Sequence, residues 1–102
     1  IPGQPLYASD EYNHRLVRMD VNADGSTSNL THFANVGEFG IAVDRNARVY
    51  VADGYIYVYT KTGELEKIID VPERPTSLVV GGKEDNILFI TARSSLYRYV
   101  IQ

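Results

Sequence analysis

The stretch GIAVDRNARVYVADGYIYVYT, residues 40–60, decides the fold. Apolar, β-branched and aromatic side chains alternate in three short runs within it, residues 41–43, 49–52 and 55–59, and turn-forming Asp, Asn and Gly residues separate the runs. Alternation with period two over so few residues is typical of half-buried β-strands joined by tight turns. The stretch therefore predicts three consecutive strands of a meander.

The same pattern continues on both sides of this stretch. Further candidate strands are residues 6–9, 16–21, 30–33, 65–69, 78–80, 87–90 and 96–100. No segment keeps a helical apolar period for three turns, and the strands follow one another at a spacing of roughly 8–12 residues. We therefore expect an all-β protein of about ten strands.

An internal repeat narrows the choice among all-β folds. Tyr7, Tyr50 and Phe89 each stand in an apolar-aromatic-apolar run that leads into a second strand, and they are 43 and 39 residues apart. A period near 40 residues with four short strands per unit is typical of β-propeller blades. A β-sandwich with a similar number of strands is the alternative.

The three repeats do not all contain the four strands of a complete blade. The repeats cover about 4–36, 37–72 and 73–102, which makes about two and a half blades of one β-propeller domain, fewer than the roughly four to eight of a closed ring. Alone, such a fragment exposes blade faces and unpaired strand edges. We therefore expect its partners to include the remaining propeller blades or, by self-association, further copies of the chain.

Charge and composition exclude several classes of protein. The net charge is −3 and no cluster of Lys and Arg is present, so a nucleic-acid partner is not expected. No apolar run is long enough to span a membrane, and no cysteine is available for a disulfide, a thiolate metal site or a nucleophile. A soluble protein is expected, whether cytoplasmic, periplasmic or secreted.

Three motifs in order carry a family resemblance. They are GIAVD at 40–44 with RVYVA at 48–52, VPERPTS at 71–77 with GGK at 81–83, and LFITARSSLY at 88–97. Their order and spacing resemble the C-terminal blades of the gluconolactonase, regucalcin and luciferin-regenerating enzyme family. The resemblance covers nearly the whole chain.

The resemblance implies a six-bladed propeller that holds a divalent metal on its axis and hydrolyses sugar lactones. Ca²⁺ is the metal expected first, with Zn²⁺ or Mn²⁺ as alternatives. A metal suits this chemistry because it polarises the lactone carbonyl and lowers the pKa of a bound water. The chain is then part of a metal-dependent sugar-lactone hydrolase. Two alternatives stay open, a non-catalytic propeller of the same lineage that binds a ligand or partner, and a repeat fragment that assembles into a ring.

One metal position of the family falls within this sequence, and here the sequence departs from the pattern. The resemblance places an Asp ligand directly before Gly40, where this chain has Phe39, whose side chain cannot coordinate a metal. Glu38 stands one residue earlier and is the candidate metal ligand. A shift of one residue turns a side chain to the other face of a strand, so the alternative interpretation of Glu38 is a solvated carboxylate in the preceding loop.

Thr76, Ser77 and Arg93 are candidates for the substrate pocket. They follow loops that can reach the axis of the ring, where a hydroxyl or a guanidinium group would hold a sugar hydroxyl or carboxylate. Hydrogen bonding between strands and blades is the alternative role for all three. No Ser lies in a nucleophile-elbow motif, so no catalytic residue is assigned.

Asp20, Asn22 and Asp24, followed by Gly25, reproduce the opening of a calcium-binding loop. The twelfth position is Thr31, whereas such loops use a bidentate Glu there, and no helix is expected on either side. The segment is either a weak surface calcium site or a β-turn that joins two strands of a blade.

Overall fold

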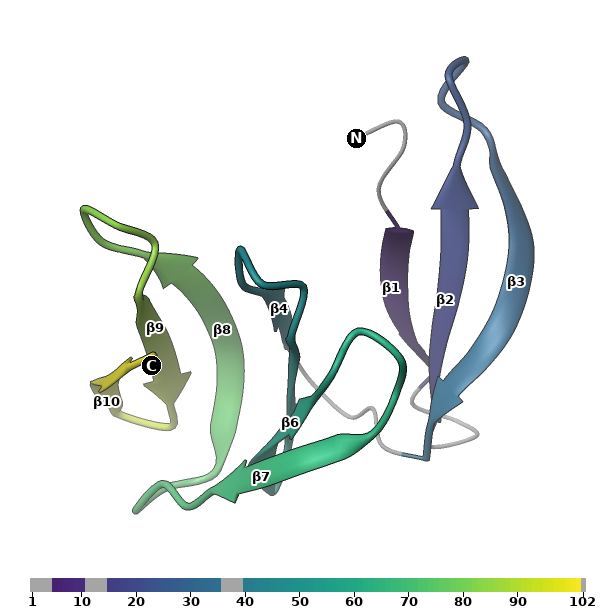
Figure 1. Ribbon diagram of the computed structural model, residues 1–102. Coiled ribbons are helices and arrows are strands. Elements are labelled where there is room, and N and C mark those ends of the chain that lie inside the picture. The colour runs from purple at the N-terminus through teal and green to yellow at the C-terminus, as the bar shows by residue number, and fades with distance from the viewer. Residues whose placement is uncertain (1–4, 11–14, 36–39, 102) are drawn as a thin grey trace. The chain divides into compact units, whose positions relative to one another are not determined.

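The computed structural model describes residues 5–10, 15–35 and 40–101. These residues form ten β-strands and no helix (Figure 1). The strands are β1 (Pro5–Asp10), β2 (Arg15–Val21), β3 (Thr27–Ala34), β4 (Ile41–Val43), β5 (Val49–Asp53), β6 (Tyr55–Tyr59), β7 (Leu65–Ile69), β8 (Pro75–Gly81), β9 (Ile87–Ala92) and β10 (Ser95–Val100). The all-β prediction is confirmed.

The strands form three antiparallel sheets, each a meander of neighbours along the chain. Their orders are β1-β2-β3, β4-β5-β6-β7 and β8-β9-β10. Each sheet lies within one of the three expected repeats. β3 and β8 begin three residues earlier than the apolar pattern indicates, since their first residues are mostly polar and exposed.

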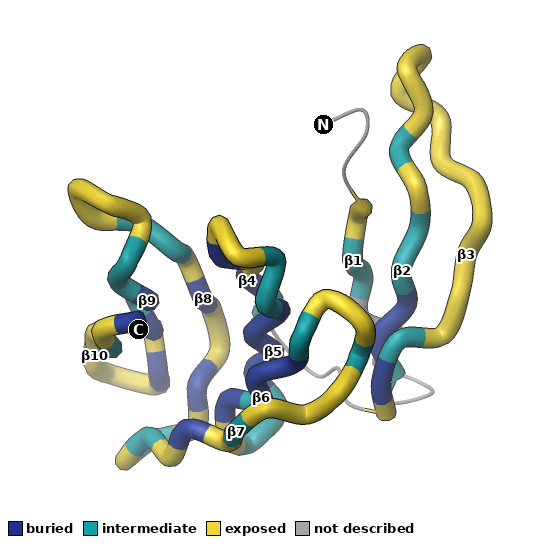
Figure 2. Tube along the Cα trace, in the orientation of Figure 1, coloured by how far each residue is buried: buried dark blue, intermediate teal, exposed yellow. Residues whose placement is uncertain are grey.

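The chain divides into two compact units, Ile1–Glu38 and Phe39–Gln102. The first unit holds the sheet β1-β2-β3, in which Leu16, Val17 and Ala34 are buried. Tyr7 packs edge-on against Phe33, with ring centroids 5.1 Å apart. The β2–β3 turn is exposed throughout (Figure 2).

The second unit consists of two sheets packed face to face. The sheet β4–β7 contributes Tyr50, Ile56 and Val58 to the shared apolar core, and the sheet β8–β10 contributes Leu88 and Ile90. All five side chains are at most 2% exposed. Because side chains alternate across each strand, one face of each sheet fills this core.

Gly40 fixes how closely the two sheets approach each other. Its N–H donates to the carbonyl of Thr76 at 3.0 Å, and its own carbonyl accepts from the N–H of Ala52 at 2.9 Å. A Cβ atom at Gly40 would lie 2.9 Å from Cα of Ser77. The start of β4 is therefore held against the start of β8 by backbone contact that only glycine permits.

Candidate functional site

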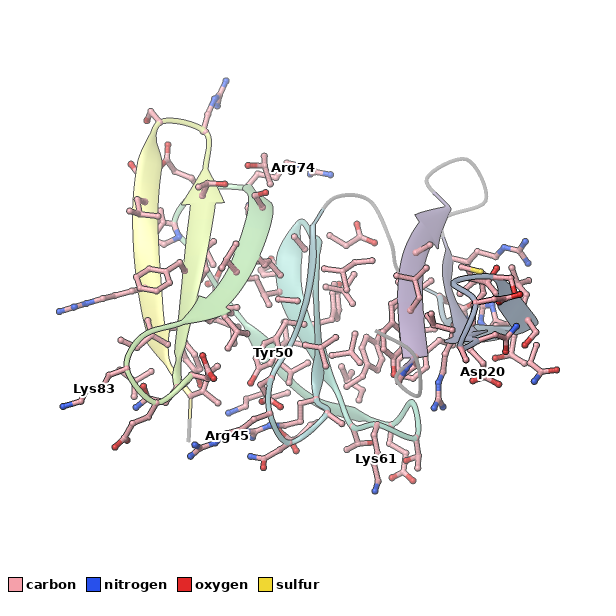
Figure 3. The ribbon with its side chains drawn as sticks, turned by 90° about the horizontal axis from the view of Figure 1, so that it is seen from above. Asp20, Arg45, Tyr50, Lys61, Arg74 and Lys83 are labelled. Atoms are coloured by element: carbon pink, nitrogen blue, oxygen red, sulfur yellow. The ribbon has the colours of Figure 1, made fainter. Side chains whose placement is uncertain are left out.

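The turns of the second unit gather at two opposite ends of its sheets. At one end lie Gly40, the start of β8 and the β9–β10 turn, since Pro75 pairs with Ala92 and Gly40 bonds to Thr76. At the other end lie the β4–β5 and β8–β9 turns. Figure 3 shows Arg74 at the first end, with Arg45 and Lys83 at the opposite end.

A hollow of about 500 Å³ opens at the first end. It is lined by Pro72, Glu73, Arg74, Thr76 and Arg93. Two of the three residues expected to contact substrate, Thr76 and Arg93, are thus brought together although 17 positions separate them in the sequence. Ser77 is not among the lining residues. It lies beside Gly40 and pairs with Thr91.

The hydroxyl of Thr76 is already engaged within its sheet. It donates to the carbonyl of Thr91 at 3.1 Å and lies 3.3 Å from the hydroxyl of the same residue. An oxygen that donates in this way keeps a lone pair with which it can accept a hydrogen bond from a ligand. Thr76 can therefore hydrogen-bond within its sheet and line the hollow at the same time.

Glu73 is oriented by hydroxyl groups from the β9–β10 hairpin. Its carboxylate accepts hydrogen bonds from Ser94 Oγ at 3.2 Å and from the hydroxyl of Tyr97 at 3.2 Å. Hydrogen bonding from Ser95, together with the bonds from Ser94 and Tyr97, lowers the pKa of Glu73 below its ordinary value. Glu73 is therefore ionised at neutral pH. This role could not be predicted from the sequence, because the three hydroxyls lie more than 20 residues further along the chain.

Arg74 is a second residue of the hollow that sequence reasoning did not select. It precedes the Pro that begins β8, so its backbone is held by the extended conformation that proline imposes on the residue before it. Its guanidinium group and that of Arg93 are both exposed to solvent at this end. The hollow thus presents two cations, one carboxylate and one hydroxyl.

The candidate metal ligand Glu38 and its neighbour Phe39 lie outside the described residues. Within the described ranges, no three His, Cys, Asp or Glu side chains lie close enough together to hold a metal ion. The divalent cation that the family resemblance implies therefore stays a prediction.

The predicted calcium loop forms the turn between β2 and β3. Asp24 Oδ1 accepts from the N–H and the hydroxyl of Ser26 at 2.9 and 2.6 Å, and Asp20 Oδ2 accepts from the amide of Asn29 at 2.9 Å. The hydrogen bonds from Ser26 lower the pKa of Asp24. Asn22 bonds to Ser26 as well. These bonds stabilise the hairpin, and the calcium site stays a prediction.

The opposite end carries a buried polar cluster that the sequence analysis did not single out. Asp44, whose side chain is 1% exposed, accepts hydrogen bonds through Oδ2 from the hydroxyl of Tyr50 and from Arg48 Nε, both at 2.8 Å. Its Oδ1 accepts from the N–H groups of Asn46 and Arg48 at 2.9 and 3.0 Å. The sequence feature that could have predicted this cluster is the spacing Asp-x-x-x-Arg-x-Tyr around a β-turn, which brings the three side chains together.

The ionisation of this cluster follows from its contacts. Burial raises the pKa of Asp44, but the hydrogen bonds from Tyr50, Arg48 and Asn46 outweigh it, and the net pKa is lowered. Burial, with the hydrogen bond to Asp44, raises the pKa of Tyr50. Asp44 is therefore a charged, fully hydrogen-bonded carboxylate, which suits a structural role better than proton transfer.

Comparison with known proteins identifies the family. The sequence profile of the SMP-30/Gluconolactonase/LRE-like region matches residues 2–94. The chain belongs to this family. The resemblance that the motifs indicated is thereby confirmed. No curated protein sequence matches the chain.

Solved structures support the same conclusion for the fold. A luciferin-regenerating enzyme superposes with a TM-score of 0.76 at 20% identity, covering 86% of this chain and 33% of that one. A calcium-binding regucalcin from Agrobacterium tumefaciens superposes with a TM-score of 0.76 at 20% identity, covering 91% of this chain and 35% of that one. The chain thus spans about a third of the length of these proteins, and its fold is part of a β-propeller. Across the described residues, no helix is long and apolar enough to cross a membrane.

Proposed function

We propose that this member of the family is part of a hydrolase that opens sugar lactones. In this proposal its residues form one wall of the substrate pocket. The observation that carries the proposal is the hollow at the start of β8, where Thr76, Arg93 and Arg74 meet. The hollow lies at the same end of the sheets as Gly40, beside which the family resemblance places a metal ligand.

The chemistry of lactone opening fits the groups that line the hollow. Water adds to the lactone carbonyl, the ring C–O bond breaks, and the products are a hydroxyl group, a carboxylate and one released proton. Negative charge therefore develops on the carbonyl oxygen and remains on the product. A guanidinium group in the pocket wall stabilises that charge by hydrogen bonds directed at it.

Sugar hydroxyls require polar partners as well. The oxygen of Thr76 can accept from one of them, while Arg74 and Arg93 can donate to others. Glu73 is held in place by the hairpin hydroxyls and keeps its charge, which does not suit it to act as a proton donor.

The proposal includes a divalent cation, although the described residues alone do not form a site for one. Calcium is the cation expected first, by analogy with the calcium-binding regucalcin. When bound, it would polarise the carbonyl and activate a water. Glu38 remains the candidate ligand from this chain, and other ligands would have to come from other parts of the propeller.

The rival proposal is a non-catalytic propeller that binds a small ligand in the same hollow. Phe39, which stands at the family's Asp position, favours it. Both proposals use the same wall of the pocket, so only an activity measurement separates them.

The test is an assay of sugar-lactone hydrolysis by the full-length protein. The reaction is monitored at neutral pH by the protons that it releases. We expect hydrolysis that is lost on treatment with a chelator and restored by adding back Ca²⁺, Zn²⁺ or Mn²⁺. Hydrolysis that survives chelation would rule out the metal. If no sugar lactone is hydrolysed while an open-chain sugar acid still binds, the non-catalytic proposal replaces this one.

A further inference from the structure

The β9–β10 turn holds Arg93 in a conformation that arginine rarely adopts. Its φ is +35°, in the left-handed region where a side chain is strained and glycine is preferred. The turn contains only Arg93 and Ser94 between the paired residues Ala92 and Ser95. Asn29, Ala47 and Asp85 also have a positive φ, so the conformation alone assigns no role, and Arg93 differs from them because its side chain lines this hollow.

The Arg93 guanidinium group is available to a ligand. Among the residues that the structure describes, no hydrogen bond or ion pair to this side chain is found. The nearby carboxylate of Glu73 is occupied by the hydroxyls of Ser94 and Tyr97. Among the described residues, Glu73 and Arg93 form no ion pair.

The hollow as a whole favours an anion. Its lining includes two guanidinium groups, those of Arg74 and Arg93, and one carboxylate, that of Glu73. Planar guanidinium groups bind carboxylates through paired hydrogen bonds, with a geometry that neutral hydroxyls do not match.

From these observations we infer that the hollow is a carboxylate subsite, and that the preferred substrates are lactones of sugar diacids. This inference rests on the proposed function. In such a substrate one carboxyl group forms the lactone and the other is ionised. Arg93 binds the ionised group, assisted by the charge of Arg74, while water opens the ring. The bound carboxylate is unchanged by the reaction, and the second carboxylate forms at the ring carbonyl.

The test compares kcat/KM of the full-length protein for a neutral sugar lactone and for a lactone of a sugar diacid. The variants are Arg93→Gly, Arg93→Lys and, as a matched control, Ala47→Gly. Ala47 also has a positive φ, +63°, but it lies in the β4–β5 turn at the opposite end. Both glycine variants relieve backbone strain, so neither is expected to unfold the protein, which a thermal melt checks.

We expect the parent to favour the diacid lactone and Arg93→Gly to lose about tenfold of that preference, mostly through KM, because the bound carboxylate does not take part in the bond changes. Arg93→Lys should keep part of the preference and Ala47→Gly all of it. An unchanged preference in Arg93→Gly, or a parent that favours the neutral lactone, would overturn the inference.

If neither lactone is hydrolysed, the proposed function fails and the subsite is tested by binding alone. Calorimetry with the open-chain sugar diacid then decides. Binding that Arg93→Gly weakens and Ala47→Gly leaves intact supports the carboxylate subsite. Equal binding to the parent and to Arg93→Gly overturns it.

Discussion

Replacing Gly40 by alanine is expected to lower the free energy of unfolding by about 3 kcal/mol, the upper range for overpacking. The added Cβ would lie 2.9 Å from Cα of Ser77, 3.0 Å from N of Leu78 and 3.1 Å from O of Thr76. All three are backbone atoms, so no side chain can rotate away and β4 must separate from β8. Urea denaturation of the full-length protein measures the effect.

Gly81→Ala is the matched control for this prediction. Neither glycine has a positive φ, and a Cβ at Gly81 would approach only the Phe89 ring, at 3.3 Å. A ring at the end of a side chain can shift by a few tenths of an ångström, so we expect a loss below about 1 kcal/mol. Equal losses in the two variants would show that the contact between β4 and β8 is not tight.

Replacing Asp44 by alanine is expected to cost about 3–5 kcal/mol, the range for removing one partner of a buried charge network. The change leaves the hydroxyl of Tyr50, the guanidinium of Arg48 and two turn N–H groups without their acceptor. Tyr50 is 1% exposed, so water cannot replace the carboxylate without opening the core. Denaturant unfolding at neutral pH measures the loss.

The pH dependence of stability provides a second measurement on Asp44. Its pKa in the folded chain is lowered from an ordinary value of 3.8, so its stabilisation is complete above that value. The stabilisation is lost as the pH falls below 3.8 towards the pKa of the folded state. Asp44→Asn should therefore lose less stability than the parent between neutral pH and that acidic range. Parallel curves for the two proteins would mean that the Asp44 charge does not stabilise the fold.

Most of the fold could be predicted because each strand carries its own local signal. Alternation and turn residues located all ten strands, and the recurrence of Tyr7, Tyr50 and Phe89 identified the repeat. The early starts of β3 and β8 were missed since exposed polar residues such as Ser28 and Thr76 have no apolar alternation. These residues are strand residues because they pair with β2 and β9. Such pairing depends on the whole sheet and leaves no local pattern in the sequence.

The candidate site was predictable only in part. Thr76 and Arg93 were selected from the loops they follow, and the structure places both in one hollow. Arg74 and Glu73 were not selected, because what gives them a role is the β9–β10 hairpin folding back beside them. Local patterns carry no information on such contacts. Asp44 differs, because its spacing to Arg48 and Tyr50 is a local pattern, but the burial that makes the cluster important comes from the core that covers it.

A crystal structure of the full-length protein with a bound open-chain sugar acid tests the central claim most directly. The account predicts the sugar acid in the hollow at the start of β8, within hydrogen-bonding distance, roughly 3 Å, of Arg93 or Thr76. A sugar acid bound at the Asp44 end, or elsewhere with the hollow filled by other side chains, would contradict it.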